Sequence, residues 1–117
     1  MDKGFEIISF QMDKEIADNH RRAGVIYSPD EFLLERLRSL AYFFESNGLT
    51  TRKILDSKNE ISKQFILKST DLTENGMKVF RKGYKGWMTN SKKRLPSDVV
   101  AFEKAFNLLK KGKIIHE

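Results

Sequence analysis

The stretch SPDEFLLERLRSLAYFFESNG, residues 28–48, decides the fold that we expect for this chain. It opens with Ser28-Pro29-Asp30-Glu31, a capping box with proline at the first helical position, which favours the start of a helix. Apolar residues then recur at helical spacing as a broad stripe, made of Phe32, Leu33, Leu37, Leu40, Ala41 and Phe44 and widened by Leu34 and Phe43. Asn47-Gly48 ends the pattern. We therefore predict a central core helix over residues 29–46.

The N-terminal stretch carries a second helical pattern. Its apolar residues recur at helical spacing at Phe5, Ile8, Met12 and Ile16. Because charged residues occupy the rest of the cylinder, a helix is predicted from about Phe5 to Arg22. The first six residues of this segment, FEIISF at 5–10, also suit the beginning of a β-strand, and that alternative stays open.

A third helix is predicted over about 72–90. It begins at the capping-box spacing of the stretch DLTE, residues 71–74. Its apolar face consists of Met77, Phe80, Tyr84 and Trp87. Glycine inside a helix costs about 1 kcal/mol relative to alanine. Gly83 and Gly86 therefore predict either close packing against a neighbouring backbone or a helix that bends or ends early.

The last helix opens at Pro96-Ser97-Asp98 and ends at Gly112. Between the second and third helices, two short extended runs flank a polar turn, which predicts a β-hairpin with residues 51–56 paired with 63–69. A short helix across 59–67 is the competing interpretation. The predicted fold is thus mainly α, with about four helices and one small β-hairpin between helices 2 and 3, in a single compact domain of residues 1–117.

The composition excludes several classes of protein. The 117 residues contain no cysteine, which excludes disulfides and cysteine-ligated zinc. The longest apolar runs, such as residues 40–44, are far too short to span a membrane. The acidic start at Asp2 and Glu6 does not resemble a signal peptide. We therefore expect a cytoplasmic protein without membrane association.

Basic charge is concentrated in the second half of the chain. Residues 1–58 contain 9 Lys or Arg and 10 Asp or Glu, whereas residues 59–117 contain 13 and 6, within a net charge of +6. A basic surface indicates an anionic partner, either a nucleic acid or an acidic protein. The alternative is a solvated lysine-rich surface that only keeps the protein soluble. The candidate partner-binding residues are Lys78, Arg81, Lys82, Lys85, Lys92, Lys93 and Arg94.

No motif in the sequence indicates catalysis, a metal or a cofactor. The two histidines, His20 and His116, belong to no metal-binding pattern. The sequence also has no phosphate-binding glycine loop and no nucleophile elbow. The carboxylates of Asp30, Asp71 and Asp98 suit helix capping. We therefore predict a protein that is not an enzyme, with no catalytic, metal-binding or cofactor-binding residues and no cofactor.

The function that we expect is the binding of a macromolecular partner by a small, non-catalytic, intracellular protein. An acidic protein suits the basic residues, and a regulatory protein or an inhibitor of the immunity type would have this composition. A homodimer through helix 29–46 is a further hypothesis. Tyr42, Phe43 and Phe44 widen the apolar face of this helix beyond what one small domain readily covers.

The alternative function is nucleic-acid binding. Residues 65–76, FILKSTDLTENG, resemble the second wing strand of winged-helix regulators and the helix start that follows it, with matches at Leu72, Thr73 and Gly76. The resemblance implies binding through the hairpin and the basic helix 72–90. However, helix 29–46, in the position of the recognition helix, is the most apolar in the chain. The alternative predicts a contiguous basic face that includes Lys63, Lys68, Lys82 and Lys85.

Overall fold

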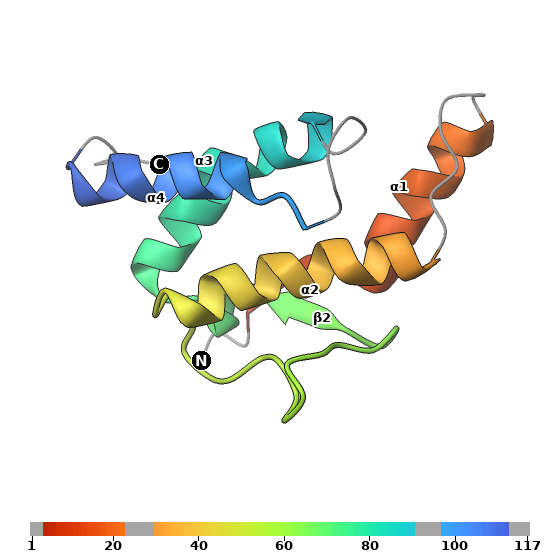
Figure 1. Cartoon of the computed structure of the whole chain (residues 1–117), viewed down its shortest axis with the longest axis horizontal. Helices are drawn as coiled ribbons and strands as arrows, with labels where there is room; N and C mark the ends of the chain where they lie inside the picture. The colour runs from red at the N-terminus through yellow and green to blue at the C-terminus, as the bar shows by residue number, and fades with distance from the viewer. Residues whose placement is uncertain (1–3, 23–29, 91–96, 113–117) are drawn as a thin grey trace.

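The computed structural model describes residues 4–22, 30–90 and 97–112 (Figure 1). In chain order, the elements are β1 (Glu6–Ser9), α1 (Phe10–Arg22), α2 (Asp30–Ser46), β2 (Ile66–Lys68), a 3-10 turn (Ser69–Asp71), α3 (Glu74–Asn90) and α4 (Val100–Lys110). The two strands form one antiparallel sheet. The prediction of a mainly α fold, with four helices and one small two-stranded sheet, is confirmed.

Helix α2 is the central core element, as its apolar stripe predicts. Its buried apolar residues are Leu33, Leu37, Leu40, Ala41, Phe43 and Phe44. The ring of Phe44 packs against Phe80 of α3 and Phe102 of α4, at centroid distances of 6.1 and 5.2 Å. Burial of one such side chain contributes about 1.5–3 kcal/mol, so α2 holds the C-terminal helices around it. The predicted capping residues Ser28 and Pro29 lie outside the described residues.

The N-terminal segment begins as a strand, which confirms the alternative that the sequence left open. Helix α1 starts at Phe10 rather than at Phe5, because residues 6–9 form β1. The hydroxyl oxygen of Ser9 accepts a hydrogen bond from the amide of Met12 at 3.1 Å and thereby caps the first turn of α1.

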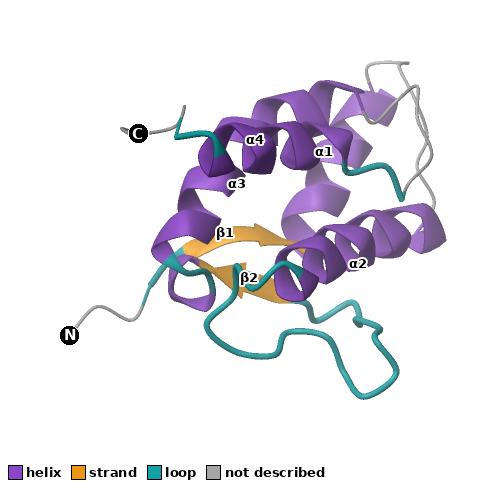
Figure 2. Cartoon of the chain, turned by 60° about the vertical axis from the view of Figure 1, so that its left-hand side comes forward, coloured by secondary structure: helices purple, strands orange, loops and turns teal. Residues whose placement is uncertain are grey.

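The pairing of the sheet differs from the predicted hairpin. One strand, β2, lies between α2 and α3 and within the predicted second arm, but its partner is β1 and not residues 51–56. Figure 2 shows β1 on one side of β2 and the long loop between α2 and β2 on the other. This loop is closed by a single antiparallel bridge between Thr50 and Leu72. The predicted pairing of 51–56 with 63–69 is therefore wrong.

The physical reason lies in Glu45, near the end of α2. Its carboxylate oxygen Oε1 accepts the amides of Ile54 and Leu55, at 2.6 and 3.1 Å. Amides bonded in this way cannot also form the ladder of a hairpin. Residues 59–65 form no helix, so the competing interpretation of a helix across 59–67 is also wrong.

The glycines inside α3 allow close packing against α4, which was one of the two predicted explanations. A side-chain carbon on Gly83 would lie 2.6 Å from the ring of Phe102 and 3.0 Å from the carbonyl oxygen of Ala101. One on Gly86 would lie 3.2 Å from Cβ of Ala101. Glycine has no such carbon, so the two helices approach closely and α3 continues to Asn90.

Side-chain oxygens accept backbone amides at the starts of the last two helices. The cap of α3 is Thr73, whose Oγ1 accepts the amide of Gly76 at 3.0 Å. Asp71, predicted to cap the same helix, instead caps the preceding 3-10 turn, where its carboxylate accepts the amide of Lys68 at 2.9 Å. Asp98 accepts the amide of Val100 at 2.9 Å, just before α4, as predicted. Gly112 follows α4 with a left-handed φ of 72°.

Candidate functional site

The predicted basic residues of α3 lie on one face of the helix. Because an α-helix has 3.6 residues per turn, the four basic residues of α3 fall within an arc of about 100° around the helix axis. We call this group, Lys78, Arg81, Lys82 and Lys85, the basic face of α3. Lys78 is half-buried and the other three are exposed, whereas the side toward the core carries the buried Val79, Phe80 and Trp87.

Little negative charge compensates this face within the described residues. The only acidic residue of α3 is Glu74 in its first turn. The ion pairs among the described residues involve neither Lys78 nor Arg81 nor Lys82. The other predicted binding residues, Lys92, Lys93 and Arg94, lie outside the described residues. The structure thus brings four of the seven predicted residues together.

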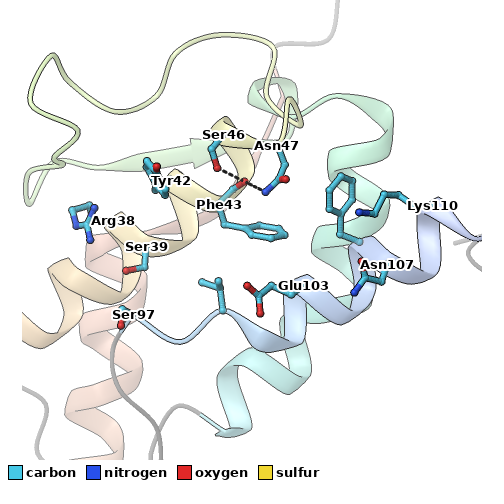
Figure 3. Close-up of a pocket in the computed structure, with 12 residues that line it drawn as sticks. Arg38, Ser39, Tyr42, Phe43, Ser46, Asn47, Ser97, Glu103, Asn107 and Lys110 are labelled. Carbon is cyan, nitrogen blue, oxygen red and sulfur yellow. Dashed lines mark hydrogen bonds between the residues drawn. The ribbon is translucent and has the colours of Figure 1, made fainter.

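A groove of about 610 Å³ lies between α2 and α4 (Figure 3). The ring of Phe43 points into it from α2, and Tyr42, which is 51% exposed, stands at its edge. Glu103 and Lys110 reach it from α4. The Lys110 ammonium lies 4.7 Å from the centre of the Phe106 ring. The lining of the groove is mostly polar, and its apolar residues are Phe43, Val99 and Phe106.

Arg36 of α2 forms a buried ion pair that the sequence analysis missed. Its Nη1 donates to Oδ2 of Asp13 at 2.5 Å, and the two side chains are 5% and 2% exposed. The guanidinium lies 4.0 Å from the centre of the Trp87 ring, and Nη2 lies 3.6 Å from Sδ of Met88. Because its side chain is buried, Arg36 offers no contact to a nucleic-acid groove. The cluster instead joins α1, α2 and α3.

Burial dominates the electrostatics of this cluster. It raises the pKa of Asp13, although the Arg36 guanidinium acts in the opposite direction. Burial also raises the pKa of Tyr84, reinforced by the charge of Asp13 and opposed by that of Arg36. Nε of Arg36 has no hydrogen-bond partner among the described residues. One signal for this site exists in the sequence, because the spacing of Arg36 from Leu33 and Leu40 is that of a core position.

No family model, no curated protein and no solved structure matches this chain. Within residues 4–22, 30–90 and 97–112, no three metal-ligating side chains gather in a way that could hold an ion. No helix in those ranges combines the length and the apolar character needed to cross a bilayer. The side chains of His20 and His116 lie outside the described part.

Proposed function

We propose that this protein binds an acidic protein partner through the basic face of α3 and does so without catalysing a reaction. The observation that supports this is the gathering of four cationic side chains on one outward face of a helix, three of them outside every ion pair of the described residues. A regulator or an inhibitor of the immunity type acts by such binding. We propose that the protein acts in the cytoplasm, because a chain without cysteine suits a reducing compartment.

The packing of α3 holds these charges at fixed spacing. Val79 and Trp87 are buried in the core, and Gly83 lies directly against α4, so the basic face is kept toward the outside of the molecule. Cations grouped on one face create a positive potential, which steers an acidic partner toward the surface and speeds its association. The affinity then depends on the charge pairs that lose water when the complex forms.

Two features favour a protein over a nucleic acid as the partner. Proteins that bind single strands stack bases on exposed aromatic rings, whereas Trp87 is 4% exposed and covered by Arg36. Lys63, which the nucleic-acid alternative requires on its basic face, pairs with Asp30 at 3.0 Å at the start of α2. Part of the charge that this alternative needs is therefore already neutralised.

A matched pair of charge reversals tests the proposal. Arg81→Glu removes a cation from the basic face, and Lys58→Glu makes the same change in the exposed loop between α2 and β2. Wild type and both variants are used to capture partners from an extract of the native cell, with and without nuclease. We expect that wild type and Lys58→Glu capture the same partner protein and retain it after nuclease treatment. Arg81→Glu should bind this partner about tenfold more weakly or not at all.

The outcomes separate the two kinds of partner. Equal capture by Arg81→Glu and Lys58→Glu would show that the basic face of α3 is not the binding surface. Complete loss of capture after nuclease would show that the partner is a nucleic acid, in which case binding should also weaken steeply with salt. Unfolding in urea verifies that both variants are as stable as wild type, as exposed substitutions should be.

A further inference from the structure

The outer edge of β2, which faces away from β1, leads to a further inference. The amide of Phe10 donates to the carbonyl oxygen of Phe65 at 3.1 Å. Ser9 and Ile66 lie opposite each other in the antiparallel ladder. Because the hydrogen bond runs between their neighbours Phe10 and Phe65, Ser9 and Ile66 form a non-hydrogen-bonded pair. The N–H and C=O of Ile66 therefore point away from β1, toward the outer edge.

The other end of β2 follows the same rule. The amide of Ser69 donates to the carbonyl oxygen of Phe5 at 2.8 Å, so the N–H and C=O of Lys68 also point outward. The Asp71 carboxylate accepts this Lys68 amide at 2.9 Å. For the Ile66 amide, no acceptor lies among the described residues. An edge with open backbone groups is a template on which another strand can pair.

A groove of about 490 Å³ runs along this edge. One side is β2 and the residues before it, and the other includes residues 52 and 54–56 of the long loop; we call residues 52–56 the wall. The apolar lining includes Leu55, Ile61 and Phe65. The charged lining forms two groups: Arg52 and Lys68, which both donate to the Asp71 carboxylate, and Asp56 and Glu60, which are joined by hydrogen bonds in the turn of the loop.

The wall is held by carboxylates and not by β2. Asp71 accepts Nε of Arg52 at 2.8 Å, and Glu45 accepts the amides of residues 54 and 55. Oδ1 of Asp56 accepts two amides of the turn that follows it, at 2.8 and 2.9 Å. Because the amides of residues 54 and 55 donate to Glu45 and that of Asp56 donates to the carbonyl oxygen of Glu60, none of these three amides pairs with β2. The groove is thus formed before any ligand arrives.

We propose that an extended peptide segment of a protein partner binds in this groove as an additional strand on the outer edge of β2. Its backbone accepts a hydrogen bond from the N–H of Ile66 and donates one to the C=O of the same residue. An apolar side chain of the peptide packs on the half-buried Ile61 and the exposed Ile66. An acidic residue of the peptide faces the Arg52–Lys68 group, and a basic residue faces the Asp56–Glu60 group.

The geometry favours a single peptide strand over a second copy of this chain. Neighbouring strands lie about 4.8 Å apart, so one strand needs little room beside β2. Pairing between the β2 edges of two copies would bring the wall of each copy into the place of the other. The groove is also distinct from the basic face of α3, so this inference goes beyond the proposed function and does not depend on it.

Selection of peptides on the whole protein tests the inference. The probe is a displayed library of random peptides of about ten residues, the upper end of ordinary strand lengths. Ile66→Pro removes the N–H that β1 does not use, and proline is tolerated on such an edge. Ile66→Val keeps the N–H and is the matched control. We expect selected peptides to bind Ile66→Pro about tenfold more weakly than wild type, and Ile66→Val nearly as tightly.

Amide hydrogen exchange in the wild-type protein gives a second measurement that does not depend on the folding of Ile66→Pro. A selected peptide should slow exchange of the Ile66 amide about tenfold or more, while the Leu67 amide, which faces β1, changes little. Equal binding to Ile66→Pro, unchanged exchange at Ile66 or the selection of no peptide would each overturn the inference. Arg81→Glu should bind the selected peptides as wild type does, which separates this test from that of the α3 face.

Discussion

At Arg36, a charged residue occupies a position that helical spacing assigns to the core. The buried Leu33 precedes it by three residues and the buried Leu40 follows it by four. Its partner Asp13 lies in α1, and both side chains are removed from water. A buried ion pair contributes little net stability, because the desolvation of two charges offsets their attraction. Loss of one partner is far more costly, since the other charge is then buried alone.

We therefore predict that Arg36→Met lowers the free energy of unfolding by about 3–5 kcal/mol, measured in urea. Combining it with Asp13→Leu should restore most of the loss, because an apolar pair then replaces the ionic one. The matched control is Arg38→Met in the same helix. Arg38 pairs with the partly exposed Glu35 at 2.8 Å, and such a surface pair contributes at most about 1 kcal/mol. Equal losses in Arg36→Met and Arg38→Met would contradict the prediction.

At the scale of elements, the long loop takes its shape from α2 and not from β2. Burial alone would raise the pKa of Glu45, but the amides of Leu55 and Ile54 and the ammonium of Lys53 together lower it. The pKa of Asp71 is lowered in the same way, because Arg52 and the amide of residue 68 outweigh burial. Both carboxylates therefore hold the loop in their ionised form.

The lowered pKa of Glu45 determines how the stability of the folded protein changes with pH. The folded protein binds this proton less tightly than the unfolded chain, whose value is near 4.5. The contribution is therefore complete above that pH and is lost as the pH falls through the lower folded value. We predict that Glu45→Gln costs about 1–3 kcal/mol at neutral pH and reduces the loss of stability between neutral pH and about pH 3. Urea unfolding across this range measures both effects.

The exposed Glu15 of α1 supplies the control for this pH dependence. Glu15→Gln removes the same ionisable group from a side chain that forms no hydrogen bond or ion pair with the described residues. It should leave the pH dependence of stability close to that of wild type. If Glu45→Gln and Glu15→Gln give the same curve, the Glu45 contacts do not stabilise the loop.

At the scale of the whole molecule, most of the apolar face of α2 through which a homodimer was predicted is buried in the core of the single chain. Phe43 and Phe44 are 8% and 0% exposed within one chain, and only Tyr42 of the three aromatic residues stays open, at 51%. Phe43 packs on Phe102 and Phe106 of α4, so a partner chain could not cover it again. The hypothesis of a dimer through α2 therefore rests on a single side chain.

We accordingly predict that the protein sediments as a monomer of 13.6 kDa at concentrations up to about 100 μM. Stable dimers bury about 800 Å² on each partner, which one exposed tyrosine cannot supply. Analytical ultracentrifugation measures the mass directly. A dimer that Tyr42→Ala dissociates would show instead that the α2 surface does mediate self-association.

Features with a local cause were predictable from the sequence. The stripe of α2 and its end at Gly48 follow from spacing within a few residues. The cost of glycine inside a helix predicted either close packing at Gly83 or a bent or shortened helix, and the structure selects the first. The basic face of α3 follows from the same periodicity. The hairpin failed because Glu45, in a different element, bonds the amides of residues 54 and 55. Nothing in the sequence pattern of the loop indicates that acceptor.

By itself, the sequence determined the number of helices, the core side of α2 and the grouping of four cations on α3. These properties depend on residues one turn apart, where helical geometry alone decides which side chains share a face. Only the tertiary structure decided that β1 pairs with β2 and that Arg36 is buried. Phe5 and Ser69, which meet beside the sheet, are 64 residues apart, and Asp13 and Arg36 are 23 apart. Contacts at such separation arise when several elements pack together, since desolvation and hydrogen bonding then select the partner.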